Sequence, residues 1–455
     1  MLKKFFVEIK GLDMRGKLLL ALIFVLPFER IPSIEAGGLT IKLSLLVGMA
    51  LILVGLKNTL SSFKGMDHFM RLPRVFLEYS ILSVIWVENM GYWFKANLVI
   101  GFCIILFYTV ISFVNNSRDR ERLVNLVLKT ILLSAGVVMA FGFFQWLGNL
   151  VGLPGSLTAI RPEYTADKLG LPRMHSVLLE PLYFGLYLLL PLGILWADRA
   201  GVVIKNFYAR FGLIALIYLS IVLSLARGAI VASAGIGLVG FFYNLPKLKH
   251  QLNKNSALTS AGTLVVLTAL LVGTVNILGK QGTDEDHLYE RGFSTIIGHL
   301  ETIKPWGSKE DAEDQNSINS RDEARSEGWE IITKSKDNFI VGVGAGQYGP
   351  NINPGLSPPK GLEATSNFML LDVWVEYGLL GLTLLTTFLA WIFLGILRAK
   401  GSRTGLSDSE RVLVTGLGLY LIGSLIQSIT FGELAITHLW VMLALLSASI
   451  VSADE

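Results

Sequence analysis

Long apolar runs separated by short polar segments constrain the fold of this chain more than any other feature. A helix needs roughly 20 apolar residues to cross the hydrocarbon core of a bilayer, where it satisfies its own backbone hydrogen bonds. With 52% hydrophobic and only 16% charged residues, the chain suits this environment better than water. We therefore predict an all-α polytopic membrane protein with about 12 transmembrane helices, at residues 18–34, 39–56, 74–88, 96–114, 123–149, 177–197, 211–225, 228–245, 257–279, 367–397, 412–428 and 435–451.

The positions of Lys and Arg predict the orientation of these helices. Cytoplasmic loops carry an excess of basic residues, and one alternating set of segments, beginning with the N-terminal one, is strongly basic. Both termini are therefore expected in the cytoplasm. The predicted organisation is nine helices in 1–279, a large extracytoplasmic loop with short helices in 280–366, and three helices in 367–455. A cleavable signal peptide at the basic N-terminus is the alternative, and it would leave eleven spans.

Arg227 occupies a two-residue break between the apolar runs 211–225 and 228–245. A guanidinium at this depth is costly, because neither the backbone nor hydrocarbon solvates it. Such a residue is kept when it faces a polar cavity or binds an anion. We expect this turn at the extracytoplasmic face, where it marks a candidate site; a purely structural arginine is the alternative.

The loop before the sixth predicted helix carries further polar candidates for the same face. Arg161, Arg173 and His175 lie in this loop, and Glu180 opens the helix. Each also has a structural explanation. Loop side chains can simply be solvated, Arg173 can reach lipid headgroups, and Glu180 can favour a helix N-terminus through the helix dipole.

The tenth predicted helix carries a third group of polar residues. Asn367 opens it, and Asp372 and Glu376 follow, four residues apart and therefore on one helix face. These carboxylates either take part in the site or are buried partners of basic residues. The helix is long enough to bend, and Gly378, after Tyr377, is the predicted position of the bend.

The external segment is predicted to contain a helix with an arginine and an aromatic side chain on one face. Ser320 begins a motif with capping-box spacing, so a helix is expected from there to about Ser335. Arg321 and Arg325 are then neighbours on this helix, with Trp329 one turn further on. This pattern suits an anionic or carbohydrate ligand, and an ordinary salt-bridged surface helix is the alternative.

Two other features are interpreted as structural. Gly342, Gly344 and Gly346 lack the strand, crossover and acidic residue of a dinucleotide site, so they predict a tight turn that returns the loop to the membrane. The single cysteine, Cys103, lies inside an apolar run and excludes a disulfide framework or a thiolate metal site. No metal site and no cofactor are expected.

Four motifs together resemble those of a known family. They are Arg173 with Ser176 and Glu180-Pro181, the Ser-Leu-Ala-Arg-Gly sequence at 224–228, the glycine-rich 342–348, and Ser366-Asn367 followed by 376–381. In this order and spacing, over roughly residues 120–400, the chain resembles the O-antigen ligase and polymerase superfamily of bacterial surface polysaccharide assembly.

The resemblance implies an integral-membrane glycosyltransferase of the GT-C-like type in the bacterial inner membrane. Such enzymes move an undecaprenyl-diphosphate-linked glycan onto an acceptor glycan or lipid at the outer face of that membrane. The expected partners are these two substrates and membrane lipids, with a chain-length regulator or a flippase as further candidates. No nucleic acid is expected.

The predicted roles follow from this chemistry. Permanently charged, planar arginines suit a lipid diphosphate better than lysines. The predicted diphosphate-binding residues are Arg173 and Arg227, with Arg325 or Arg161 contributing. The candidates for the general base are His175, Glu180 and Glu376, of which His175 and Glu180 are favoured because they lie close to Arg173. The predicted acceptor-binding residues are Ser366, Asn367, Asp372 and Trp329.

The position before Asn367 bears on which branch of the family is closest. In the ligase branch this position usually holds a catalytic histidine, whereas this chain has Ser366. Serine cannot replace imidazole as a base near neutral pH. We therefore predict a polymerase of O-antigen or exopolysaccharide repeat units. An O-antigen ligase is the alternative, and a transporter or flippase of lipid-linked oligosaccharide is a second alternative.

Overall fold

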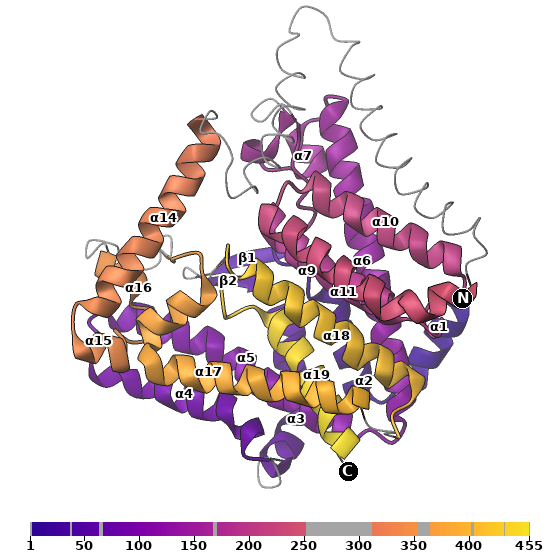
Figure 1. Cartoon of the computed structure of the whole chain (residues 1–455), viewed down its shortest axis with the longest axis horizontal. Coiled ribbons are helices and arrows are strands. Elements are labelled where there is room, and N and C mark those ends of the chain that lie inside the picture. The colour runs from indigo at the N-terminus through magenta and orange to yellow at the C-terminus, as the bar shows by residue number, and fades with distance from the viewer. Residues whose placement is uncertain are drawn as a thin grey trace, which may run out of the picture. The chain divides into compact units, whose positions relative to one another are not determined.

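The computed structural model of the chain is built almost entirely of helices (Figure 1). It describes residues 2–36, 39–62, 67–166, 171–251, 312–352, 365–401, 405–431 and 433–454. The chain divides into two compact units. The first unit comprises Met1–Thr130, Asn316–Gly418 and Gln427–Glu455, and the second comprises Ile131–Gln315 and Leu419–Ile426.

The first unit contains most of the elements. They are α1 (Leu2–Lys10), α2 (Met14–Val25), β1 (Ser33–Ala36), β2 (Leu39–Lys42), α3 (Leu43–Ser62), η2 (Phe69–Arg71), α4 (Leu72–Leu82), η3 (Ser83–Ile85), α5 (Met90–Asn115), α14 (Ala312–Thr333), α15 (Lys336–Ile340), α16 (Tyr348–Ile352), α17 (Met369–Gly401) and α19 (Thr437–Asp454). The second unit contains α7 (Gly155–Thr158), η4 (Pro162–Tyr164), α9 (Pro181–Ala197), α10 (Phe207–Leu223) and α11 (Arg227–Gln251). Residues of α6 (Arg120–Leu150) and α18 (Asp408–Gln427) fall in both units, and the start of α14, before Asn316, also belongs to the second unit.

Helix α5 forms the centre of the first unit, and α3 and α19 pack against it. The ring of Phe107 on α5 is fully buried. It meets Phe388 of α17 at 5.7 Å and Trp440 of α19 at 5.9 Å, both edge to face, which is a favourable geometry for aromatic pairs. In the second unit α9 packs on α11 so closely that a Cβ at Gly185 would clash with Ala229.

Long apolar helices occur at several of the predicted spans. Within the described residues, four helices have the length and composition to cross a membrane: Met90–Asn115, Arg120–Leu150, Met369–Ala399 and Asp408–Gln427. Shorter apolar helices occupy Leu43–Thr59, Pro181–Ala197, Phe207–Leu223, Arg227–Tyr243 and Thr437–Val451. The predicted span at 257–279 lies outside the described residues. A polytopic helical protein is therefore supported, while the number of 12 spans and their orientation stay predictions.

The segment between the first two predicted spans differs from the prediction. Residues assigned to the ends of these spans form the antiparallel pair β1–β2, with Ser33 opposite Lys42 and Ile34 opposite Ile41. The apolar content of the segment favoured helix in our prediction. However, β-branched residues favour strands, and the Gly-Gly sequence between these two strands is typical of a hairpin.

Two predictions about helices have different outcomes. The bend in the tenth predicted span is confirmed, because Gly378 interrupts α17 with φ 61° and ψ −170°. The start of the external helix was wrong: α14 begins at Ala312, so Ser320 lies inside it rather than at its N-terminus. Ala, Glu and Gln before Ser320 are good helix formers, and they extend the helix beyond the capping-box motif.

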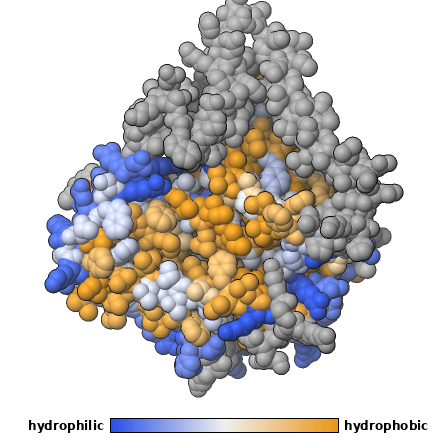
Figure 2. Space-filling view, viewed as in Figure 1, coloured by the Kyte–Doolittle hydropathy of each residue, from blue (hydrophilic) through white to orange (hydrophobic). Residues whose placement is uncertain are grey.

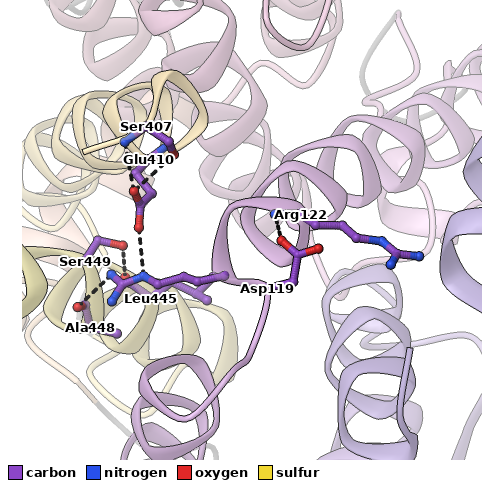
Figure 3. A network of polar contacts seen from close by, with 8 residues as sticks. Asp119, Arg122, Ser407, Glu410, Leu445, Ala448 and Ser449 are labelled. Atoms are coloured by element: carbon purple, nitrogen blue, oxygen red, sulfur yellow. Dashed lines mark hydrogen bonds and ion pairs between the residues drawn. The ribbon is translucent and has the colours of Figure 1, made fainter. Parts of the chain in front are cut away.

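An ion pair and its neighbouring hydrogen bonds link three helices in the first unit (Figure 3). Arg120, at the start of α6, pairs with Glu410 of α18 at 2.8 Å (Nε to Oε1), and its Nη2 donates to the carbonyl of Ala448 on α19 at 3.0 Å. The other oxygen of Glu410 accepts from the backbone N–H and the hydroxyl of Ser407, both at 3.0 Å. The Arg120 and Glu410 side chains are only 18% and 10% exposed, so neither charge is well solvated by water.

We expect Arg120→Met to destabilise the protein strongly. The substitution leaves the buried Glu410 carboxylate without its cation, which costs about 3–5 kcal/mol in comparable buried pairs. The measurement is thermal unfolding of the full chain in detergent. The matched control is Arg74→Met, because the Arg74–Glu78 pair is 56% and 52% exposed and such pairs contribute at most about 1 kcal/mol. Equal losses from the two variants would contradict the assignment.

Candidate functional site

The turn between α10 and α11 has a strained backbone. Leu225, in the middle of the turn, is buried and adopts φ 52°, a left-handed conformation that is uncommon for a bulky residue. The Ser224 hydroxyl donates to the carbonyl of Ile221 at 2.6 Å and accepts from the backbone N–H of Ala226 at 3.3 Å. Strain of this kind persists where the surrounding structure enforces it, and it is frequent at functional sites.

Arg173 is one of the side chains that hold this turn. Its Nε donates to the carbonyl of Ser224 at 3.2 Å, and its Nη2 donates to the carbonyl of Leu225 at 3.1 Å. The backbone N–H of the next residue, Met174, donates to the carbonyl of Leu223 at 3.0 Å. Residues 173–174 are thus hydrogen-bonded to the backbone at the C-terminal end of α10.

Arg227 is the first residue of α11. A cation at this position opposes the helix dipole, whose positive end is the N-terminus. The first backbone N–H groups of a helix point towards bound anions. Arg173 binds the carbonyls that immediately precede Arg227, so the structure brings these two predicted residues to the same turn. An anion at this turn would interact favourably with the Arg227 charge and with the positive end of the α11 dipole.

Tyr164 links the arginines of the preceding loop. The guanidinium carbons of Arg161 and Arg173 lie 5.6 Å and 5.7 Å from the centre of its ring, within cation–π range. The Tyr164 carbonyl also accepts from the backbone N–H of Arg173 at 2.9 Å. Burial raises the pKa of the Tyr164 hydroxyl above its usual value; the carboxylate of Glu180 raises it further, and the two arginines lower it.

Sequence reasoning did not identify Tyr164. The available signal was an aromatic residue three positions after Arg161, and sequence alone could not place it beside Arg173. In the structure its ring also contacts the imidazole of His175, with a centroid separation of 5.4 Å. The tyrosine is therefore the shared neighbour of three predicted site residues.

His175 is completely buried. Its Nε2 accepts a hydrogen bond from the backbone N–H of Arg161 at 3.3 Å. Nearby, Gln145 of α6 donates to the carbonyl of Ser176 at 3.0 Å, and the Ser176 hydroxyl donates to the carbonyl of Val138 at 2.7 Å. The imidazole thus lies inside the loop, in a position that suits holding the loop in shape.

Glu180 differs from His175 in its exposure. It is the N-cap residue of α9, but its side chain makes no capping hydrogen bond, and it is exposed. Arg161 lies close by: its Nη1 donates to the carbonyl of Leu179 at 3.0 Å, and its Nη2 pairs with Glu163 at 2.6 Å. Of the favoured base candidates, Glu180 is the one that a substrate in solvent can reach.

The remaining predicted residues belong to the first unit. Ser366 is buried, and its hydroxyl donates to the carbonyl of Phe368 at 3.1 Å and accepts from the N–H of Phe368 at 3.2 Å. Its backbone N–H donates to Asp372 at 2.7 Å, and Asn367 adopts φ 54°. These contacts form the turn that begins α17. They hold the Ser366 hydroxyl and one carboxylate oxygen of Asp372 within this turn.

Glu376 lies at the bend of α17. Because Gly378 breaks the helix, the carbonyls of Val375 and Glu376 accept from the backbone N–H groups of Val343 and Gly344, at 2.9 Å and 2.8 Å. Gly342, Gly344 and Gly346 all have positive φ, so the glycine-rich segment is a tight turn, as predicted. A Cβ at Gly342 would clash with the backbone at Gly378.

Arg325 and Trp329 lie on α14. The Arg325 Nη2 donates to the carbonyl of Ile429 at 2.6 Å, and its Nη1 lies 3.5 Å from Asp322. Trp329 contacts Trp374 of α17. The first unit therefore holds Arg325, Trp329, Ser366, Asn367, Asp372 and Glu376. The second holds Arg161, Arg173, His175, Glu180 and Arg227.

Comparison with known proteins gives one family. Residues 211–386 match the family model described as O-antigen ligase. The matched segment is less than half of the chain; it includes the turn at Arg227 and the first part of α17, whereas Arg173 and Glu180 precede it. No curated protein is similar to the chain in sequence.

Proposed function

We propose that this chain, a protein of the O-antigen ligase and polymerase superfamily, is a bacterial membrane glycosyltransferase that polymerises O-antigen or exopolysaccharide repeat units. The family implies a lipid-linked glycan and an acceptor as partners. In our proposal the lipid is undecaprenyl diphosphate and the transfer takes place at the outer face of the inner membrane. The long apolar helices support a membrane protein.

One observation carries the proposal: Arg173 binds the strained turn from which Arg227 starts α11. The departing group of the donor is a lipid diphosphate on which negative charge grows during transfer. In our proposal Arg227, the first N–H groups of α11 and the positive charge of Arg173 stabilise this negative charge. Because these groups are held in place before the reaction, little reorganisation is needed in the transition state. Arg161 contacts the same Tyr164 ring as Arg173 and adds further positive charge beside it.

The acceptor hydroxyl needs a base, and Glu180 is the residue we propose for it. Its carboxylate is exposed and lies near Tyr164, which also contacts Arg173. His175, in contrast, is buried with Nε2 accepting from the backbone, and we assign it to positioning the loop. In the first unit, Asn367 and Asp372 remain proposals for acceptor binding, Arg325 for diphosphate binding and Glu376 as the alternative base.

The ligase alternative is favoured by the description of the matching family. Against it, Ser366 occupies the position of the ligase histidine, and its hydroxyl is buried in the turn at the start of α17. A serine hydroxyl held in this way is not placed to accept a proton from an acceptor. We therefore favour the polymerase.

Deleting the gene in its host and separating the surface glycans by length tests the proposal. We expect single repeat units on the acceptor in place of a ladder, because assembly would stop after one unit. If the gene encoded a ligase, its deletion would instead leave polymer on the lipid carrier. If it encoded a flippase, lipid-linked units would stay in the cytoplasmic leaflet of the membrane. Restoration of the ladder by the wild-type gene, but not by an Arg227→Ala gene, is the control for indirect effects.

A further inference from the structure

One end of the first unit exposes large apolar side chains beside charged ones. On α14 and α15, Trp329 is 49%, Phe339 38% and Ile340 46% exposed. Trp374 of α17 holds them together: its ring lies 5.4 Å from that of Trp329 and 5.2 Å from that of Phe339, and its Nε1 donates to the Phe339 carbonyl at 3.1 Å. We call Trp329, Phe339, Ile340 and Trp374 the aromatic surface.

The aromatic surface is fixed to the helix ends beneath it. The Tyr79 hydroxyl of α4 donates to the carbonyl of Val341 at 2.7 Å, immediately after α15. Gln347 exchanges two hydrogen bonds of 2.9 Å with the backbone of Asn89, in the turn before α5. In the glycine-rich turn, the backbone N–H groups of Val343 and Gly344 donate two further hydrogen bonds to the bend of α17. Because these bonds come from three elements, α15 stays at the end of α4, α5 and α17.

The apolar exposure continues from the aromatic surface onto these helices. In and around the turn between α4 and α5, Leu82, Ile85, Met90 and Phe94 are 54%, 78%, 54% and 61% exposed. Helices α5 and α17 both have the length and composition of membrane spans. Figure 2 shows hydrophobic side chains along α17 and hydrophilic ones towards α14. The aromatic surface thus lies where an apolar helix surface gives way to a polar one.

Residues of this kind at this position fit the headgroup layer of a bilayer. Tryptophan is enriched at membrane–water interfaces, because its ring is apolar and its N–H is polar. Trp374 lies near the start of the apolar helix α17. The exposed Lys334 precedes α15 and the exposed Lys336 begins it, and both can extend to lipid phosphates. In Figure 1, α14 runs across the direction of α17, as a helix at a membrane surface would.

We propose that the aromatic surface binds the lipid headgroup layer, so that α15 and the C-terminal end of α14 rest on the bilayer at the end of α17. The partner is the bilayer lipid itself. Trp329, which the sequence suggested as an acceptor-binding residue, becomes a membrane anchor in this proposal. The inference goes beyond the glycosyl transfer proposed above and does not depend on it.

The depth of single side chains in the bilayer tests this proposal. Cys103 is the only cysteine and is buried, so Cys103→Ala gives a background for labelling. Spin labels are attached to Phe339→Cys or Ile340→Cys in nanodiscs of phosphatidylethanolamine and phosphatidylglycerol. The matched control is Glu323→Cys, an exposed position on a different face of α14 from Trp329. Accessibility to oxygen and to a water-soluble nickel reagent is measured.

We expect the labels at 339 and 340 to lie about 5–10 Å into the headgroup and acyl boundary, as interfacial helices do, with several-fold lower nickel accessibility than the label at 323. Equal nickel accessibility at the three positions would overturn the proposal. Strong dipolar coupling between labels at 339 would also overturn it, because it would assign the surface to a second copy of the chain.

A second measurement avoids the cysteine background. Wild-type protein and Trp329→Phe are compared in liposomes of lipids brominated near the headgroup. Wild-type tryptophan emission should be quenched more than that of the variant, and equal quenching would count against the proposal. Neither readout requires glycosyl transfer, so a failed polymerase assignment would not be confused with a failed anchor.

Discussion

Replacing Arg227 with alanine is expected to lower the rate of glycan transfer by about a hundredfold to a thousandfold, the usual effect of removing one donor that stabilises a developing charge. Arg227→Lys keeps the charge but loses the planar fork that binds two phosphate oxygens, so it should recover only part of this loss. The measurement is kcat for polymer formation by the purified full chain, with lipid-linked repeat units as substrate. Because the charge develops in the transition state, kcat should fall more than KM rises.

The melting temperatures of the variants distinguish the role of Arg227 from that of Arg173. Arg227 opposes the dipole of α11, so removing its charge should not lower the melting temperature through that interaction. Arg173 binds the carbonyls of Ser224 and Leu225, and the conservative Arg173→Lys should lower both activity and the melting temperature. If Arg227→Lys retained full activity, or if it unfolded as readily as Arg173→Lys, the assignment of Arg227 to the diphosphate would be wrong.

The local features of the fold that could be predicted share a common cause. Gly378 could be placed at a bend because a glycine inside an unusually long apolar run is a weak point of a helix. Arg227 could be placed at a helix junction because an arginine interrupts two apolar runs. In both cases the signal lies within a few residues of the feature, and packing did not override it.

The features that were missed depend on contacts between distant residues or on competing local signals. Tyr164 acquires its importance from Arg173, nine positions away, and from His175. The burial of His175 follows from how the loop closes over it, which no periodicity reveals. At β1–β2 the apolar content favoured helix, whereas β-branched residues favoured strands, and the two strands pair.

Glu180→Gln is expected to lower kcat by about a hundredfold to ten-thousandfold, the range for losing a general base. The amide has nearly the shape of the carboxylate but does not take up a proton near neutral pH. Glu180 makes no capping bond to α9, so its replacement should leave the melting temperature almost unchanged. The kinetic and thermal measurements are made on the same preparation of the full chain.

Glu163→Gln is the matched control, because Glu163 belongs to the same loop and pairs with Arg161 at 2.6 Å. That pair is partly exposed, so its loss should cost at most about 1 kcal/mol of stability and leave transfer largely intact. If Glu163→Gln were the more damaging substitution, Glu180 could not be the base. Equal activity of Glu180→Gln and the wild type would transfer the role to the first unit, where Glu376 is the remaining candidate on the bend of α17.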